Sequence, residues 1–130
     1  MSSTSHTNPP QFFILAGHGG KDPGAIANGI QESELTFEQQ GLITNALRSL
    51  GAKVLNEPKQ ASFQKTIAYV KTLCQPEDVV VDLHFNAATP AASGTEVYYR
   101  QRYAPKELTI AQLLSRRIAD TLDIPDRGGK

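Results

Sequence analysis

Residues 79–84 read Val-Val-Val-Asp-Leu-His, an almost unbroken apolar run that ends in a histidine. Such a run is typical of a central strand in a parallel sheet covered on both faces. A second apolar run, Phe12 to Ala16, is followed two residues later by His18. The two runs predict a parallel sheet whose strands lead into histidines.

Helical patterns alternate with these strands. Apolar residues recur at helical spacing over three ranges, about 34–50, 63–74 and 105–122. Residues 53–56 and 94–100 add two short predicted strands, and the glycine-rich stretch 17–29 predicts a loop. The alternation predicts an α/β fold of three layers, a mostly parallel sheet with helices on both faces. The apolar positions of the first helix are Leu35, Leu42, Ile43, Ala46, Leu47 and Leu50.

The chain has 130 residues, which fits one domain. The composition of residues 1–11 predicts a flexible leader, and residues 12–130 are expected to form the folded domain. Thirteen basic residues balance thirteen acidic ones, so the charge does not favour a nucleic-acid partner. We expect no membrane span, because no apolar run is long enough. No signal peptide is visible, so we expect synthesis in the cytoplasm unless a signal was removed. The oligomeric state is not predicted.

His18 and His84 follow strand ends, where ligands bind in open α/β sheets. Catalytic zinc takes three protein ligands and leaves one position for water, and two histidines with a glutamate form one such set. Glu32 precedes the first helix and can reach back over the glycine-rich loop as the third ligand, with Glu34 as its nearest competitor. Each residue alone has a simpler explanation, such as a surface histidine or a glutamate that favours the helix dipole.

Five short segments, three of which contain these residues, occur in a fixed order along the chain. They are Gly17–Ala25, Gly29–Leu35, Leu83–Ala87, Gly94–Tyr99 and Asp126–Gly128. In this order they resemble the motifs of the zinc-dependent N-acetylmuramoyl-L-alanine amidases, the Amidase_3 family. The resemblance implies that Zn²⁺ is held by His18, Glu32 and His84. It also implies hydrolysis of the amide between N-acetylmuramic acid and L-alanine in peptidoglycan.

Two further assignments concern proton transfer and contact with the substrate. The family carries a second, catalytic glutamate on a final strand, which we expect to be absent from a chain that ends at Lys130. Glu96 is then the candidate for proton transfer, with a structural role as the alternative. Asn86 and Ala87 are expected to line the substrate groove, unless Asn86 only caps its strand.

Three functions are therefore weighed. The first is a cell-wall-degrading amidase, such as an endolysin, that reaches peptidoglycan after release or delivery. The second is a peptidoglycan-binding module that kept the fold and the metal but is catalytically impaired. The third is a different zinc hydrolase, such as a carboxypeptidase.

Overall fold

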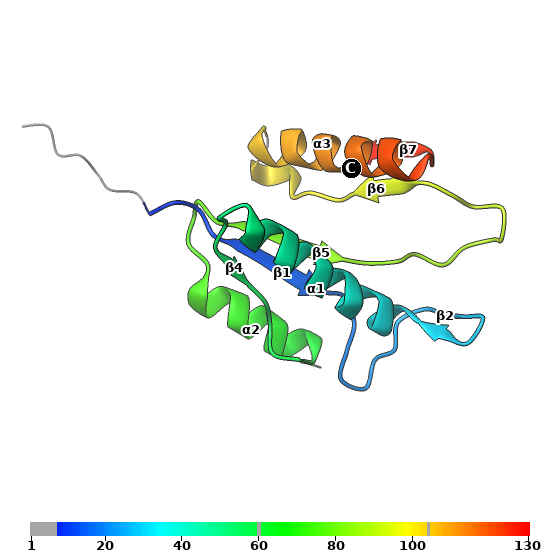
Figure 1. Cartoon of the computed structure of the whole chain (residues 1–130), viewed down its shortest axis with the longest axis horizontal. Coiled ribbons are helices and arrows are strands. Elements are labelled where there is room, and N and C mark those ends of the chain that lie inside the picture. The colour runs from blue at the N-terminus through cyan, green and yellow to red at the C-terminus, as the bar shows by residue number, and fades with distance from the viewer. Residues whose placement is uncertain (1–7, 60, 104) are drawn as a thin grey trace, which may run out of the picture. The chain divides into compact units, whose positions relative to one another are not determined.

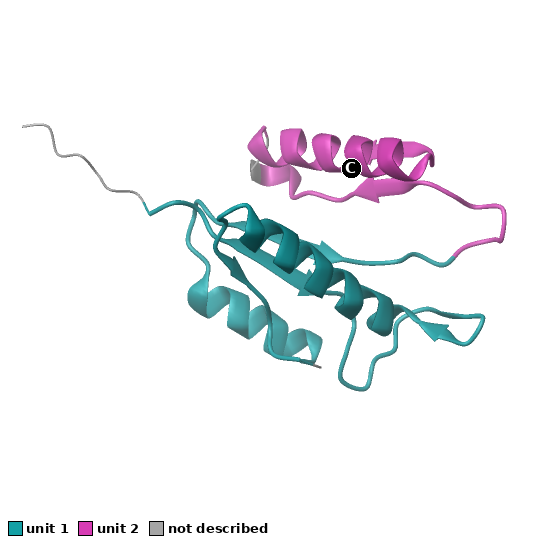
Figure 2. Cartoon of the chain, in the orientation of Figure 1, with its two compact units in different colours: residues 1–87 teal, residues 88–130 magenta. Residues whose placement is uncertain are grey.

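The computed structural model describes residues 8–59, 61–103 and 105–130. The chain divides into two compact units, unit 1 at residues 1–87 and unit 2 at residues 88–130 (Figure 2). Most of the predicted leader, residues 1–7, lies outside the described residues, and the single domain over residues 12–130 stays a prediction.

Unit 1 is built on a parallel sheet of three strands (Figure 1). β1 (Phe12–Ala16) lies between β4 (Val54–Leu55) and β5 (Val79–Leu83). The register runs from Phe12 opposite Val79 to Ala16 opposite Leu83, so β1 and β5 end at the same level. Within unit 1 the central strand is therefore β1 rather than the predicted Val79–Leu83 run.

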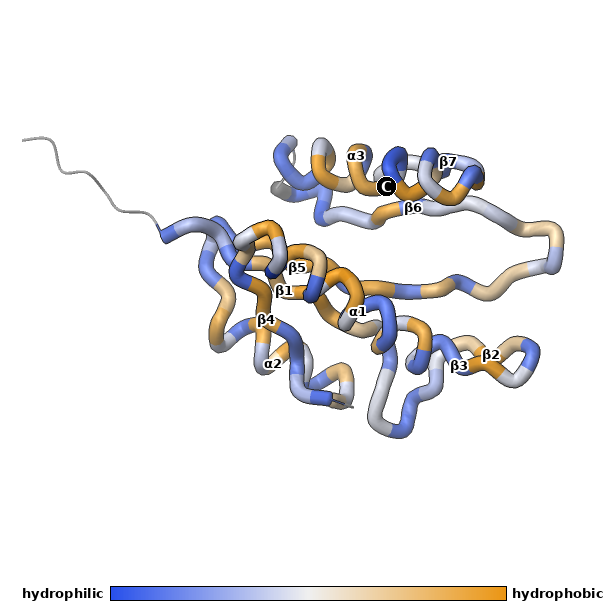
Figure 3. Tube along the Cα trace, viewed as in Figure 1, coloured by the Kyte–Doolittle hydropathy of each residue, from blue (hydrophilic) through white to orange (hydrophobic). Residues whose placement is uncertain are grey.

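Unit 1 also contains the helices α1 (Glu32–Ser49) and α2 (Phe63–Leu73). Three successive residues of β1, Phe13, Ile14 and Leu15, are buried. Because successive side chains of a strand point to opposite faces, both faces of β1 are covered. Tyr69 of α2 meets Phe13 edge to face, with the ring centroids 6.3 Å apart. The predicted α/β class with helices on both faces is confirmed, and Figure 3 shows hydrophobic residues concentrated in β1 and β5.

The buried side of α1 is polar, which the apolar pattern did not predict. Thr36, Gln40 and Thr44, spaced four residues apart, are 0%, 4% and 2% exposed, and we call them the polar stripe. The Thr36 hydroxyl donates to the Gly17 carbonyl at 2.7 Å. The Gln40 amide donates to the Ile14 carbonyl at 2.8 Å. Thr44 Oγ1 lies 3.1 Å from the Asn56 side chain. Of the expected apolar positions, Leu42 and Leu50 are 57% and 82% exposed.

The stretch 17–29, predicted as a loop, contains part of a small hairpin. β2 (Ile26–Ala27) pairs antiparallel with β3 (Ile30–Gln31). The two connecting residues, Asn28 and Gly29, both have positive φ, at 51° and 77°. Asn-Gly is the preferred pair for a two-residue hairpin turn that needs φ above zero at both positions. The hairpin leads directly into α1, which begins two residues before the predicted Glu34.

Unit 2 contains β6 (Thr95–Val97), a short 3-10 helix at Gln101–Tyr103, α3 (Lys106–Leu122) and β7 (Asp126–Gly129). β6 and β7 are parallel. α3 buries Ala111, Ser115 and Ala119. β7 was not predicted, because its sequence has no apolar alternation. None of the helices among the described residues has the length and apolarity needed to cross a membrane.

Candidate metal centre

His18 is placed by the end of β1. The strand pairing continues one residue further, because the Gly17 N–H donates to the Leu83 carbonyl at 2.8 Å. Gly17 is required there, since a Cβ would lie 2.2 Å from that carbonyl oxygen and 2.6 Å from His84 Cε1. His18 then takes the left-handed conformation, with φ of 67°, which is uncommon for a residue other than glycine. The chain therefore turns sharply at the point where the imidazole leaves the sheet.

Glu32 is the first residue of α1, and its side chain is 6% exposed. Its two carboxylate oxygens accept backbone N–H groups from different segments, Ala25 at 3.0 Å and Phe85 at 2.8 Å. Burial by itself raises the pKa of Glu32, but these two N–H donors and the neighbouring histidines outweigh it. The pKa of Glu32 is therefore below its ordinary value, and the carboxylate is ionised at neutral pH.

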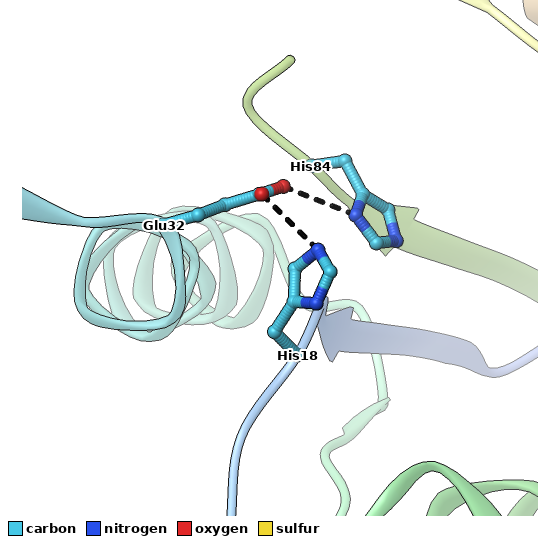
Figure 4. Close-up of side chains that lie close together, drawn as sticks. All are labelled: His18, Glu32 and His84. Atoms are coloured by element: carbon cyan, nitrogen blue, oxygen red, sulfur yellow. Dashed lines mark hydrogen bonds and ion pairs between the residues drawn. The ribbon is translucent and has the colours of Figure 1, made fainter. Parts of the chain in front are cut away.

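The structure brings His18, Glu32 and His84 together (Figure 4). His18 Nε2 lies 3.1 Å from Glu32 Oε2, and His84 Nδ1 lies 3.2 Å from Glu32 Oε1. One ligand atom from each residue falls within 4.8 Å of the others. The carboxylate thus stands between two imidazoles that come from the ends of neighbouring parallel strands.

Each histidine has a second carboxylate on its opposite nitrogen. Asp22 Oδ2 lies 2.9 Å from His18 Nδ1, and Asp82 Oδ2 lies 3.2 Å from His84 Nε2. The Asp22 contact raises the pKa of His18 above its ordinary 6.5. Neither aspartate was predicted from the sequence as a partner of a histidine. The spacing Asp82-x-His84 was the available signal, because residues two apart on a strand share a face.

The donor set suits zinc. Two imidazole nitrogens and one carboxylate oxygen are a known ligand set for catalytic zinc, and they leave a fourth position open. Ligand atoms about 2.1 Å from a tetrahedral ion lie about 3.4 Å apart. His18 Nε2 and His84 Nδ1 lie 3.1 and 3.2 Å from different oxygens of Glu32, and one ligand atom from each residue falls within 4.8 Å of the others. Carboxylates on the outer imidazole nitrogens are also the usual surroundings of zinc-binding histidines.

A cavity of about 220 Å³ opens beside His18 in unit 1. Its walls come from the loop after β1, the first half of α1 and the segment after β4; Gly19, Gly20, Phe37, Glu57 and Lys59 are among its lining residues. The Lys59 ammonium sits 5.2 Å from the centroid of the Phe37 ring. The cavity gives a substrate room next to one of the three candidate ligands.

The other predicted site residues are distributed differently. Glu34, the competitor of Glu32, is exposed on the first turn of α1 and lines the cavity rather than joining the three-residue cluster. Asn86 and Ala87 follow β5 and are exposed. Neither lines the cavity beside His18. Their assignment to a substrate groove stays a prediction.

Glu96 lies on β6 in unit 2 and has partners there. It accepts a hydrogen bond from the Lys130 ammonium, and the Tyr98 hydroxyl donates to it at 3.1 Å. Arg127 Nε is 3.5 Å away. The hydrogen bond from Lys130 is the main reason that the pKa of Glu96 lies below its ordinary value. Its predicted role in proton transfer stays a prediction.

Comparisons with known proteins show which family and which solved fold the chain is similar to. The family model described as N-acetylmuramoyl-L-alanine amidase matches residues 13–130. The chain is 30% identical over 122 residues to the uncharacterized protein YqiI of Bacillus subtilis, covering 91% of this chain and 58% of that protein. It is also 30% identical over 122 residues to the N-acetylmuramoyl-L-alanine amidase LytC of the same organism, covering 92% of this chain and 25% of LytC.

The fold is similar to that of a solved amidase structure. The N-acetylmuramoyl-L-alanine amidase from Clostridium difficile 630 superimposes with a TM-score of 0.80 at 25% sequence identity. The superposition covers 95% of this chain and 69% of that one. The chain thus spans between a quarter and about 60% of the two curated relatives.

Proposed function

Because the chain belongs to the N-acetylmuramoyl-L-alanine amidase family, we propose that it hydrolyses the amide between N-acetylmuramic acid and L-alanine in peptidoglycan, with a zinc ion held by His18, Glu32 and His84. The observation that carries the proposal is the convergence of these three side chains, whose ligand atoms lie within 4.8 Å of one another. The action is on the cell wall, after release or delivery of the protein.

A bound zinc ion would supply a Lewis acid for the substrate carbonyl and would lower the pKa of water to about 7. The protein's own residues supply the rest of the arrangement. Glu32 is ionised and anchored by two backbone N–H groups, so it can act as a negative ligand without reorganisation. The cavity beside His18 gives the acyl or peptide part of the substrate a place next to the cluster.

An amine leaves only when it is protonated, so the reaction also needs a group that moves a proton. We propose Glu96 for this role, and Asn86 and Ala87 for contacts with the substrate. A lowered pKa keeps Glu96 ready to accept a proton but makes it a weak base, because efficient proton transfer needs a pKa near the working pH. Glu96→Gln therefore tests the assignment. A loss of turnover with unchanged zinc binding supports it, and unchanged turnover refutes it.

The hydrolase activity is tested by dye release from labelled peptidoglycan, with and without a chelator. We expect release that stops with chelator, returns with zinc and leaves new L-alanine amino groups. His84→Ala should abolish it, while the matched control Glu38→Gln, an exposed position of α1, should not.

Other outcomes identify the alternatives. Binding to peptidoglycan without release indicates the binding module. Release of a C-terminal amino acid indicates a carboxypeptidase.

A further inference from the structure

Asp82 has a relationship to His84 that the proposed reaction does not use. The two side chains lie on the same face at the end of β5, and Asp82 Oδ2 is 3.2 Å from His84 Nε2. The opposite nitrogen, Nδ1, faces Glu32 Oε1 at 3.2 Å. The imidazole of His84 is therefore held between two carboxylates, and only the inner one belongs to the three-residue cluster.

A neutral imidazole carries a single N–H, and its other nitrogen offers a lone pair. A metal in the cluster needs the lone pair of His84 on Nδ1, because that nitrogen faces Glu32. The proton must then sit on Nε2, where the Asp82 carboxylate accepts it. An acceptor at Nε2 thus favours the one tautomer that can bind metal.

The corresponding pair at His18 is less specific. Asp22 also accepts the Gly24 N–H at 3.0 Å, so it shapes the glycine-rich loop as well as orienting the imidazole. Within the described part of the chain, the Asp82 carboxylate pairs with the His84 ring. Both side chains are half exposed, at 47% and 43%, so a change at Asp82 does not disturb a buried core.

We propose that Asp82 is a positioning residue that holds His84 in the Nε2–H tautomer and so presents Nδ1 to the metal. The inference rests on the proposed metal site. This positioning role differs from a simpler explanation, in which Asp82 is only an exposed charge that keeps the strand soluble. It also differs from a purely electrostatic one, in which any nearby negative charge attracts the cation.

Zinc affinity, measured by competition with a chromophoric chelator, separates these explanations in the full chain. Asp82→Ala removes both the charge and the acceptor, and we expect about 10- to 100-fold weaker zinc binding. Asp82→Asn keeps a carbonyl acceptor but loses the charge. It should fall between the wild type and Asp82→Ala, because charge-assisted hydrogen bonds are about twice as strong as neutral ones. Glu38→Ala removes an exposed charge on α1 and should bind zinc like the wild type.

The zinc affinities of the wild type and the two Asp82 variants distinguish failure of the metal site from failure of the positioning role. If the wild type does not bind zinc, the proposed function fails as well. If the wild type binds and Asp82→Ala binds equally, only the positioning role is overturned. Equal losses in Asp82→Asn and Asp82→Ala, with unchanged folding by circular dichroism, also overturn it, because charge alone then accounts for the effect.

Proton NMR of the zinc-loaded protein gives a readout that does not depend on activity. In the wild type we expect two slowly exchanging imidazole N–H signals, from His18 Nδ1 and His84 Nε2. Asp82→Ala should broaden or lose one of them, and Asp82→Asn should retain both. A full set of signals in Asp82→Ala would contradict the proposal.

Discussion

The imidazole rings of His18 and His84 lie edge to face, with centroids 5.0 Å apart and an angle of 86° between the planes. The relationship follows from the sheet, because β1 and β5 are neighbours and end in register. A single residue, Gly17, separates the end of β1 from His18, and it lets the two strands approach without a side chain between them. The site is thus assembled by strand pairing rather than by a local motif.

Zinc should stabilise the protein. At a free zinc concentration about 100 times the dissociation constant, linkage adds about 2.7 kcal/mol to the free energy of unfolding. His84→Ala removes a candidate ligand whose side chain is 43% exposed, so the variant should fold but gain nothing from zinc. Thermal unfolding with and without zinc checks this. Equal stabilisation of both proteins would remove His84 from the ligand set.

Gly24→Ala should damage the metal site directly. Gly24 has φ of 66°, and a Cβ there would lie 2.6 Å from His18 Cδ2 and 2.7 Å from Glu32 Oε2. We expect lost stability and at least tenfold weaker zinc binding. Gly29→Ala is the matched control, since its φ is 77° but its Cβ would meet nothing within 4 Å. It should cost only the backbone strain, about 1–2 kcal/mol. Similar zinc affinities in the two variants would refute the steric argument.

Glu57 should give the protein a pH-dependent stability. Burial raises the pKa of Glu57 above its ordinary 4.5, although Ala16 N–H and the Gln40 amide donate to it. The folded state therefore holds this proton more tightly than the unfolded state. Its contribution to stability is complete below about pH 4.5 and is lost as the pH rises through the folded pKa.

The test compares wild type and Glu57→Gln by urea unfolding over a series of pH values. Glu57→Gln lowers stability overall, because its amide nitrogen would face the Gln40 donor. The difference between the two proteins should nevertheless shrink as the pH rises from about 4.5 towards neutrality. A constant difference at every pH would show that Glu57 does not titrate in this way.

Ser115→Ala should destabilise unit 2. The Ser115 side chain is fully buried, and its hydroxyl oxygen lies 2.5 Å from Asp126 Oδ1 and 3.2 Å from the Thr95 carbonyl. Its loss removes these contacts between α3 and the two strands, while Asp126 Oδ1 keeps the Gly128 N–H as a donor, so we expect a cost of about 0.5–1.5 kcal/mol. Chemical denaturation measures the loss. Thr121→Ala, an exposed position on the same helix, should change stability much less.

Gly41→Ala should stabilise the protein. Gly41 lies inside α1 and is exposed, and a Cβ there would meet nothing within 4 Å. Alanine is about 0.8–1.0 kcal/mol more favourable than glycine in a helix interior. The gain should appear as a higher midpoint of urea unfolding with unchanged zinc affinity. A destabilised variant would mean that Gly41 packs against a part of the protein that covers this face.

The sequence predicted the α/β class and the residues of the three-residue cluster, because apolar runs mark the strands and the histidines follow them. It did not predict Asp82 as a partner of His84, since the strand pattern alone does not tell which nitrogen of the ring faces outwards. It also missed β7, whose residues Asp126–Gly129 carry little apolar surface. β7 is held by backbone pairing with β6. Gly129 also lies close to Ala111 of α3, so the strand packs without burying large side chains.

The buried side of α1 was missed for a related reason. The spacing of the leucines correctly predicted a helix, but it did not identify which residues of that helix are buried. Thr36, Gln40 and Thr44 are polar and carry no hydrophobic signal, yet they are almost fully buried. Their burial is stable because each meets a specific partner in or just after a strand. Such a partner is a tertiary property that the local pattern does not contain.

An apolar contact between a helix and a sheet survives a small slide along the helix axis, whereas a hydrogen bond weakens steeply once its partners separate or tilt. The three bonds of the polar stripe, to Gly17, Ile14 and Asn56, therefore restrict both the axial position and the rotation of α1 against the sheet of unit 1. Glu32 lies one turn before Thr36 on the same helix. The axial position and the rotation of α1 therefore also fix where the Glu32 side chain lies. The position of the Glu32 carboxylate beside two imidazole rings therefore depends on residues outside the three-residue cluster. Leucines in the polar stripe would keep the helix packed on the sheet but would no longer fix that position.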